Sequence, residues 1–518
     1  MRVAVIGSGL AGLAATQALV RAGLKPVVID SGERLPAERA AAVARMSGCA
    51  PTEWDPRDRA LVSLNPSVSA SGIPSKLAFG SDYFFRQADP VLPFRGSGAV
   101  FPTSAAGGVS VAWGATVLAP PRPEIVDWPI DVQAFEAAAR RVRGWLPLAA
   151  DMADGLLPKF PTFGPTQDLP PMSPSVEAVS AALSEKARGC GFAFGRARLA
   201  LLRKVCRECG FCLHGCPYGA IYSAEDAFDE FYRAGKAEKC HGIGVEDLSE
   251  EGEGVRIKGR SLEDRSPREF VFDRVFLAAG ALNSTHILMR SLPDAPPEVR
   301  LRTSQKFVLP LLLWRATRDS GMSRPTLAEL FIEYESRAAG GRWVHCQVSG
   351  PNDMLAQRLG ADRGGARGMI GRAVLARAVV LWASLHSDRS GGLTARLERA
   401  ADGRSTMVLT EERNPLTAAT LRGVSAEIRG HLRGAGLILP VGGEVARIGS
   451  GNHIGSSFPM MRVPHGLVSS DPLGRPGRFR RVHVVDSSIL PDIPATTIAF
   501  ASMTLADHVV TAALEAIG

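Results

Sequence analysis

The fold of this chain is decided at residues 2–12, which read RVAVIGSGLAG. Residues 2–6 form a short apolar run typical of a buried strand, and the Ala/Leu-rich residues 13–22 have helical spacing. A second apolar run, residues 27–29, ends on Asp30. A strand, a G-x-G-x-x-G turn, a helix and a second strand together predict a βαβ unit that binds a dinucleotide.

Each glycine of the turn has a separate physical role. Gly7 permits the tight turn, Gly9 lets backbone N–H groups approach a pyrophosphate, and Gly12 lets the helix pack closely on the strand. The N-terminus of the helix adds partial positive charge, and Asp30 can accept hydrogen bonds from a ribose. We therefore predict a dinucleotide site formed by Gly7, Gly9, Leu10, Ala11, Gly12 and Asp30. The motif alone leaves the choice between NAD and FAD open.

Length and composition limit the classes of protein. At 518 residues the chain is long enough for two domains, and 45% hydrophobic with 22% charged residues are typical of a soluble globular protein. The net charge is +8, but no Lys/Arg run is interleaved with aromatic residues, which make up only 6% of the chain. We therefore expect no nucleic-acid partner, while attraction to an acidic partner or an anionic membrane surface stays open.

The sequence offers no targeting or membrane segment. The first strand begins at residue 2, which leaves no room for a signal peptide. The best apolar candidate for a span, Met369–Leu385, is interrupted by Arg372 and Arg377. These features predict a cytoplasmic protein with no transmembrane segment.

The stretch from Lys306 to Pro440 differs from the rest of the chain in its pattern of apolar residues. Residues 307–314, 327–334, 343–348 and 379–385 are expected to form strands. Residues 416–435 have the periodicity of an amphipathic helix. We expect a second domain here, built on an antiparallel sheet with helices on one face. Upstream, the apolar run 274–278 predicts a strand that returns the chain to the nucleotide sheet.

Three separated segments are similar to motifs of one enzyme family. Residues 106–114, AGGVSVAWG, are similar to the G-G-x-S-x-x-W-G segment of the glucose–methanol–choline (GMC) oxidoreductases. Residues 278–284, AAGALNS, resemble that family's A-A-G-A-x-x-S turn. Residues 452–455, NHIG, followed by VDSSILP at 485–491 and by Thr497-Ile498, resemble its C-terminal signature. The resemblance touches both ends and the middle of the chain, and it implies that the dinucleotide is FAD.

The chain thus resembles a divergent GMC oxidoreductase. This implies an α/β fold, with a Rossmann-type FAD-binding domain and an α+β substrate domain built on an antiparallel sheet. The expected parts of the FAD-binding domain are residues 1–150, residues 195–302 with the cysteine cluster, and residues 443–518 with the catalytic tail. Residues 151–194 are expected to be a connecting excursion, and residues 303–442 the substrate-binding domain.

The resemblance also implies roles for single residues. His453 would remove the hydroxyl proton of an alcohol while hydride leaves carbon for flavin N5, and a neutral imidazole suits this work near pH 7. Val245 would meet the adenine through its backbone, and Asp486 the ribityl or phosphate part. The helix that begins near Thr497 would point its N-terminus at the flavin pyrimidine. Beyond the first motif, the residues implied to hold FAD are Gly107, Gly108, Ser110, Gly114, Val245, Ala279, Gly280, Asp486, Thr497 and Ile498.

The sequence departs from the family beside the expected catalytic tail. The family has Asn-Pro a few residues before the Thr-Ile, and that Asn or a His assists the catalytic His. Residues 491–498 read PDIPATTI here and contain neither. Thr496 or Thr497 could offer a hydroxyl to the substrate, but neither is a strong base. The second catalytic role therefore stays unassigned.

Four of the eight cysteines are close together in the sequence. Cys206, Cys209, Cys212 and Cys216 have the spacing C-x2-C-x2-C-x3-C-P, by which bacterial ferredoxins bind iron–sulfur clusters. Because no second set exists, they predict one [4Fe–4S] or [3Fe–4S] centre, with a zinc site or reduced structural thiols as the alternatives. A cluster would pass electrons singly to an acceptor protein, which favours a dehydrogenase over an oxidase.

The leading interpretation is an FAD-dependent dehydrogenase that oxidises the CH–OH group of a sugar-like or other alcohol. One alternative is a ferredoxin-linked reductase or desaturase, in which electrons would flow in the opposite direction, toward the substrate. A second alternative is a non-catalytic electron-transfer subunit, which would account for the missing Asn. The substrate is not indicated by the sequence.

Overall fold

The structure is a computed structural model that describes residues 1–63, 77–85, 91–100, 102–184, 191–317, 326–400, 405–432, 437–438 and 444–517. Its strands form four sheets, one parallel, one mixed and two antiparallel. The α/β class and the antiparallel sheet of the second domain are therefore confirmed. The predicted domain boundaries stay predictions, and the one at 442/443 lies outside the described residues.

The N-terminal motif builds the centre of the parallel sheet, whose strand order is β20-β9-β1-β2-β5. The strands are β1 (Val3–Ile6), β2 (Val27–Asp30), β5 (Glu238–His241), β9 (Arg274–Leu277) and β20 (Val482–Val484). Val5 of β1 pairs with Val28 of β2 on one side and with Phe276 of β9 on the other. The predicted βαβ unit and the predicted return of the chain at residue 274 are both confirmed.

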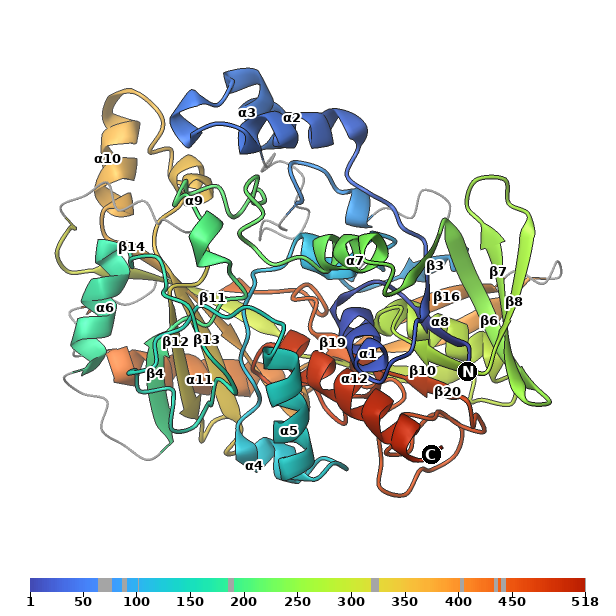
Figure 1. The fold of residues 1–518 in the computed structure, drawn as a ribbon. Helices are drawn as coiled ribbons and strands as arrows, with labels where there is room; N and C mark the ends of the chain where they lie inside the picture. The colour runs from blue at the N-terminus through green and yellow to red at the C-terminus, as the bar shows by residue number, and fades with distance from the viewer. Residues whose placement is uncertain are drawn as a thin grey trace.

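Helices cover this sheet (Figure 1). Helix α1 (Leu10–Arg21) packs on α12 (Ile498–Glu515), which also packs on α5 (Val132–Arg143). Buried alanines such as Ala14 and Ala18 let the helices approach closely. Further helices of this part are α4 (Arg122–Val126), α7 (Ala224–Arg233) and α8 (Ala281–Ser291).

Helix α12 is, within the described residues, the one helix long and apolar enough to cross a membrane. However, 67% of that apolar window is buried inside the protein. Its packing against α1 and α5 accounts for the apolar composition, as for a core helix. The cytoplasmic location stays a prediction.

The second domain is organised by a seven-stranded antiparallel sheet of order β17-β11-β14-β13-β12-β4, with β18 also paired to β11. The strands are β4 (Phe192–Arg196), β11 (Lys306–Leu313), β12 (Leu330–Glu335), β13 (Trp343–Ser349), β14 (Ala378–Ser384), β17 (Leu437–Ile438) and β18 (Glu444–Val445). The four predicted strands are present. The predicted helix is α11 (Thr417–Leu432), and its last predicted residues lie outside the described ones.

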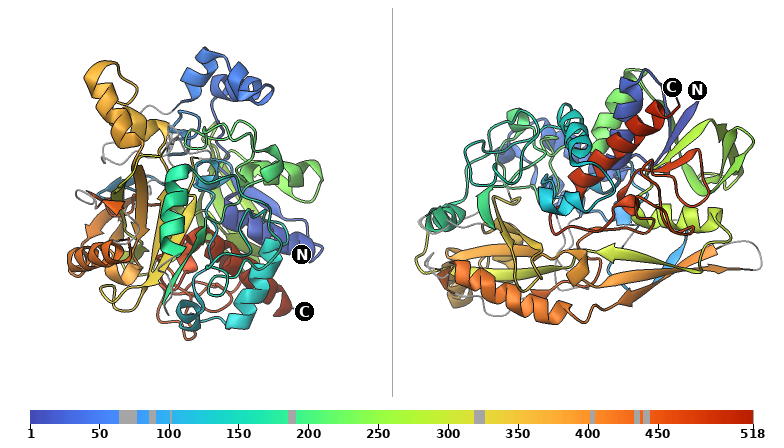
Figure 2. Two further views of the ribbon diagram at one scale, coloured as in Figure 1. Left: turned by 90° about the vertical axis from the view of Figure 1, so that its left-hand side faces the viewer. Right: turned by 90° about the horizontal axis from the view of Figure 1, so that it is seen from below.

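The two faces of this sheet differ because side chains alternate along each strand. On one face, Phe307, Leu309 and Leu381 pack with α11 and α6 (Pro174–Ser184) in a separate apolar cluster. Figure 2 (right) shows α11 on the outer side of the sheet. Phe331 and Trp343, from the opposite face, belong to the main core with the nucleotide sheet. The opposite face is therefore turned toward the nucleotide-binding part.

Two smaller sheets complete the molecule. A mixed sheet of order β19-β10-β15-β16-β3 connects the two parts. Its strands are β3 (Phe94–Gly96), β10 (Glu298–Thr303), β15 (Gly392–Arg399), β16 (Ser405–Glu412) and β19 (Ile454–Gly455). The second is an antiparallel sheet of β6 (Ile243–Glu251), β7 (Gly254–Ser261) and β8 (Pro267–Phe272).

Several short helices lie outside the sheets: α2 (Ala37–Ser47), α3 (Pro56–Val62), α9 (Asp353–Arg358) and α10 (Gly365–Leu375). The sequence of helix α2 has only a weak apolar periodicity, and the helix buries only Ala42 and Met46. The apolar stretch 369–385 is divided between α10 and β14, which agrees with the prediction that it is not a membrane span.

Candidate active site

A cavity of about 410 Å³ opens at the carboxyl ends of β1 and β2. Its walls include Gly7, Asp30, Val245 and Ala279, which come from segments far apart in the sequence. Ligands of open α/β sheets bind in this position, and the volume lies in the usual range for cofactor sites. The structure thus brings these predicted residues around one cavity.

Sterics explain the glycines of the first motif. A Cβ on Gly7, whose φ is +102°, would lie 2.3 Å from the carbonyl oxygen of Ala278. A Cβ on Gly12 would lie 2.0 Å from the carbonyl oxygen of Gly7. Neither position can hold a side chain, so the glycines are needed for the turn and for packing of α1. Leu10 and Ala11 are buried in the first turn of that helix.

The second glycine loop lies directly against the first. The N–H of Gly107 donates a hydrogen bond to Ser8 Oγ at 3.0 Å, and a Cβ on Gly108 would lie 3.1 Å from Gly9 Cα. Ser110 Oγ donates to the carbonyl of Gly107 at 2.6 Å and holds the loop in place. The two loops predicted to contact the dinucleotide are therefore neighbours.

Gly114 differs from these glycines, because nothing lies within 4 Å of a Cβ built on it. The structure shows no steric need for glycine there, and its contact with FAD stays a prediction.

Asp30 is held rigidly at the end of β2. Its carboxylate accepts hydrogen bonds from the N–H groups of Ser8 and Gly32, both at 2.6 Å. Burial raises the pKa of Asp30 to about 6, although these hydrogen bonds act in the opposite direction. The side chain lines the cavity, where it can also accept hydrogen bonds from a ribose.

Asp486 is occupied by donors of the protein itself. One oxygen accepts from the N–H of Gly280 at 2.8 Å and from Ser284 Oγ at 2.5 Å, and the other accepts from the N–H of Ser488 at 2.9 Å. Asp486 therefore fixes the turn at Gly280, whose φ is +83°, beside the C-terminal segment. Its direct contact with FAD stays a prediction.

The threonines before α12 have different surroundings. Thr497 Oγ1 donates to the carbonyl of Thr116 at 3.2 Å. Thr496 is fully buried, and its hydroxyl has no hydrogen-bond partner among the described residues. Thr497 is the residue preceding Ile498, which begins α12. No interaction joins either threonine to His453 in the described part of the chain.

His453 lies where the two domains meet. Its carbonyl accepts from the N–H of Ser304 at 3.0 Å, and Arg302 on β10 pairs with Gly455 on β19. Two residues later, the N–H of Ser456 donates to the carbonyl of Ser487 at 2.9 Å. The two halves of the C-terminal signature therefore run side by side.

The imidazole of His453 is available as a base. Its buried Nδ1 has no hydrogen-bond partner among the described residues. Burial, followed by the charges of Lys306 and His345, lowers the pKa of His453 well below its ordinary value. The ring is therefore neutral at physiological pH and can accept a proton.

A row of polar residues crosses the inner face of the seven-stranded sheet. Lys306 pairs with Ser384, Ser384 with His345, and His345 with Glu333. Residues directly opposite in an antiparallel sheet project from the same face. His345 Nδ1 lies 2.5 Å from Glu333 Oε1, and both side chains are fully buried. Sequence reasoning gave His345 no role, because only strand register brings these residues together.

Comparison with known proteins agrees with this geometry. Residues 5–41 match the family model of the NAD(P)-binding Rossmann-like domain. No curated protein matches the sequence. Among solved structures, pyridoxine 4-oxidase from Mesorbium loti is similar over 98% of both chains, with 16% sequence identity and a TM-score of 0.57.

The chain has the fold of pyridoxine 4-oxidase. The predicted resemblance to the GMC oxidoreductases is thus confirmed at the level of the fold. At this identity the similarity describes the architecture, so the reaction has to be argued from the site.

The four cysteines of the predicted cluster are divided between two apolar clusters. Cys212 is buried in the main core with Cys206 and Cys216 at its edge, whereas Cys209 packs with Trp54 in a smaller cluster. Burial raises the pKa of the Cys206 and Cys209 thiols. In the described ranges, no group of three or more His, Cys, Asp or Glu side chains is placed to hold a metal ion. The described residues therefore give no support for the predicted iron–sulfur or zinc site, and the role of these cysteines stays a prediction.

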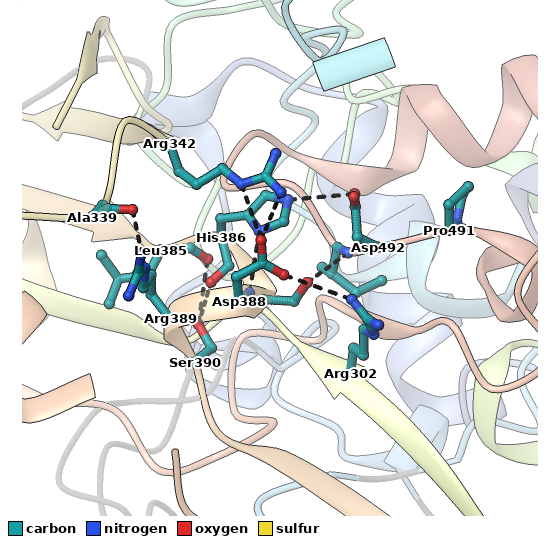
Figure 3. Close-up of polar contacts among 12 residues, drawn as sticks. Arg302, Ala339, Arg342, Leu385, His386, Asp388, Arg389, Ser390, Pro491 and Asp492 are labelled. Atoms are coloured by element: carbon teal, nitrogen blue, oxygen red, sulfur yellow. Dashed lines mark hydrogen bonds and ion pairs between the residues drawn. The ribbon is translucent and has the colours of Figure 1, made fainter. Parts of the chain in front are cut away.

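A second buried network, also missed by sequence reasoning, holds the segment that leads to α12 (Figure 3). His386 lies between two carboxylates, 3.3 Å from Asp388 and 3.4 Å from Asp492. Trp128 Nε1 donates to Asp492 at 3.2 Å, and Arg342 lies 2.7 Å from Asp388. The network therefore fixes Asp492, four residues before Thr496, to the turn that follows β14.

Proposed function

We propose that the chain is an FAD-dependent oxidoreductase of GMC type that oxidises the CH–OH group of an alcohol, with His453 as the base. The observation that carries this proposal is the buried, unpartnered and neutral Nδ1 of His453. His453 lies beside the polar row of the seven-stranded sheet. The segment that carries it is hydrogen-bonded to β10 and to the C-terminal segment near Ser487.

The nucleotide cavity fits the adenine end of FAD. Its glycine turns allow close backbone approach, Asp30 faces the space, and Val245 lies in its wall. Gly7, Gly9, Gly107, Gly108 and Ala279 would hold the cofactor through the backbone. When bound, FAD supplies a two-electron acceptor.

The protein supplies the proton transfer and the positioning. Removal of the hydroxyl proton needs an acceptor that is neutral at the working pH, and His453 meets this requirement because its pKa is lowered. A positioned base of this kind contributes roughly 10²–10⁴-fold to the rate. The sheet face carrying Lys306, Ser384 and His345 would orient the alcohol.

The electron acceptor of the proposed reaction is not assigned by the site. The described residues give no support for a cluster at the cysteines, so no electron-transfer step is assigned to them, and a one-electron acceptor protein stays a prediction. The similar enzyme is named for oxidation of pyridoxine, which therefore belongs in the panel of alcohols tested.

The proposal is tested by anaerobic bleaching of the bound flavin with a panel of sugars and alcohols. We expect His453→Gln to retain FAD but to lose roughly 10²–10⁴-fold in the rate of bleaching. The matched control is His465→Gln, because His465 is exposed. If the flavin of His453→Gln is bleached as fast as that of wild type, His453 is not the catalytic base. If no alcohol bleaches wild-type flavin but reduced ferredoxin does, the protein is a reductase, and if neither does, it is an electron-transfer subunit.

A further inference from the structure

We propose that the active site recognises an anionic group of its substrate through Lys306, so that the substrate is an alcohol carrying a carboxylate or a phosphate. This inference rests on the proposed function and names the substrate class of the same site. It comes from the placement of Lys306, from the absence of any partner for its ammonium group, and from its position beside His453.

Lys306 is the first residue of β11 and belongs to the polar row on the inner face of the sheet. Its in-register neighbour is Ser384, and next in the row stands His345. The alternate residue, Phe307, points to the opposite face and packs under α11. Strand alternation thus directs the lysine toward the nucleotide-binding part and not toward solvent.

The loop that carries His453 covers the stem of the lysine. A Cβ on Gly451 would lie 3.0 Å from both Cδ and Cε of Lys306, so the loop packs tightly against the stem of the lysine. His453 follows two residues later, and the lysine charge contributes to the lowered pKa of its imidazole. The ammonium group therefore lies in the electrostatic range of the proposed base.

Among the described residues, the ammonium group has no counterion. No hydrogen bond or ion pair joins Lys306 Nζ to another side chain of the described ranges, and the residue is half-buried. The acidic residue of the same row, Glu333, is engaged by His345 at 2.5 Å. Burial lowers the pKa of Lys306 from 10.5 to about 8, with no compensating carboxylate.

Lys306 is half-buried, and a charged group that is partly removed from water costs free energy unless a counterion or a ligand is paired with it. A carboxylate or phosphate on the substrate would supply the missing charge and place the carbinol carbon next to His453. Lysine acts here as a point charge, which suits either group. A neutral alcohol would leave the ammonium group without a counterion.

The experiment uses the FAD-loaded protein and matched pairs of alcohols that differ only in charge. The carboxylate pair is 4-(hydroxymethyl)benzoate and its neutral amide, and the phosphate pair is pyridoxine 5′-phosphate and pyridoxine. The quantity measured is the ratio of kcat/KM for the charged and the neutral member, in wild type, Lys306→Met and Lys306→Arg. The control is Lys258→Met, because Lys258 is exposed on β7. Binding of benzoate, with benzamide as the neutral probe, is measured by calorimetry.

We expect wild type to prefer the charged member of at least one pair by about tenfold or more, the usual range for a charge-assisted contact. Lys306→Met should abolish this preference and the binding of benzoate, and Lys306→Arg should restore part of both. The pair that shows the preference distinguishes a carboxylate from a phosphate substrate.

Two results would overturn the inference. One is the absence of a charge preference in wild type. The other is an equal fall in kcat for charged and neutral alcohols in Lys306→Met, which would mean that the lysine acts on the reacting oxygen. If no alcohol bleaches the flavin but benzoate binds in a Lys306-dependent way, the proposed alcohol oxidation is wrong and the proposed anion site is supported. If benzoate binding is unaffected by Lys306→Met, the anion site is wrong whatever the reaction.

Discussion

At the scale of single residues, the groups assigned to function are poorly satisfied within the fold. His453 Nδ1 has no hydrogen-bond partner among the described residues, and Lys306 has no counterion there. Other buried polar groups of the site, such as Asp30 and Asp486, are held by several hydrogen bonds each. The contrast separates residues that shape the cofactor cradle from residues placed to meet a substrate.

Because Lys306 is half-buried and has no partner among the described residues, we expect Lys306→Met to be more stable than wild type. The pKa of Lys306 is about 8 in the folded state and 10.5 when unperturbed. The charged form is thus disfavoured by folding, at a cost of about 3 kcal/mol below pH 8. The cost should decrease between pH 8 and 10.5, since the folded protein releases the proton first. Denaturant unfolding of both proteins from pH 7 to 10.5 measures this. A constant difference across the range, or none, would show that the ammonium group is solvated.

At the scale of elements, the short turn after β14 holds the segment that leads to α12. The N–H of Ser387 donates to the carbonyl of Ile493 at 2.9 Å, and Ser387 Oγ accepts from the N–H of Ile493 at 3.1 Å. His386 adds ion pairs on both sides of this contact, to Asp388 and Asp492. The turn therefore determines where the N-terminus of α12 begins.

The His386 network predicts a stability that decreases in alkaline solution. Burial acts to lower the pKa of His386, but Asp388 and Asp492 outweigh it and raise the pKa to about 9. A raised histidine pKa stabilises the folded state fully below about pH 6.5, and the stabilisation is lost as pH rises through 9. Glu124 in the same network has a pKa raised to about 7, mainly by burial, so its ionisation acts in the same direction.

We expect the free energy of unfolding to decrease by about 3 kcal/mol between pH 6.5 and 9, and His386→Gln to lose most of this dependence. Urea unfolding at a series of pH values measures both. A control is His465→Gln, which should keep the wild-type profile because His465 is exposed. An identical pH profile in His386→Gln would show that the two carboxylates do not hold its proton.

At the scale of the whole molecule, the cofactor cradle is assembled from distant parts of the chain. The first glycine turn, the loop at Gly107, strand β6 and the turn at Gly280 meet only in the folded state. The bound cofactor should therefore stabilise the complete fold, because it binds only when these parts are together.

Gly108→Ala tests this assembly, and Gly430→Ala on α11 is its control. Gly108 has a φ of +56°, and a Cβ there would lie 3.1 Å from Gly9 Cα, whereas nothing lies within 4 Å of a Cβ on Gly430. We expect Gly108→Ala to lose at least tenfold in FAD affinity and about 1–2 kcal/mol in stability. FAD content and Tm with and without added FAD measure the effect. Equal FAD affinity in both variants would show that the two glycine loops need not touch.

The sequence by itself determined the features that depend on local patterns. The βαβ unit at residues 2–30, the strands of the second domain and helix α12 follow from apolar periodicity and from glycine spacing, which act over a few residues. Of the residues around the nucleotide cavity, Gly7, Asp30, Val245 and Ala279 were also predicted, whereas most of the lining was not.

Only the tertiary structure decided the rest of the site. Lys306, Ser384, His345 and Glu333 form one row because of the register between strands far apart in the sequence, and register is set by packing of the whole sheet. The cysteine spacing predicted a metal site, and no group of side chains in the described ranges supports it. Local patterns specify which elements form, and the packing of those elements decides which side chains meet.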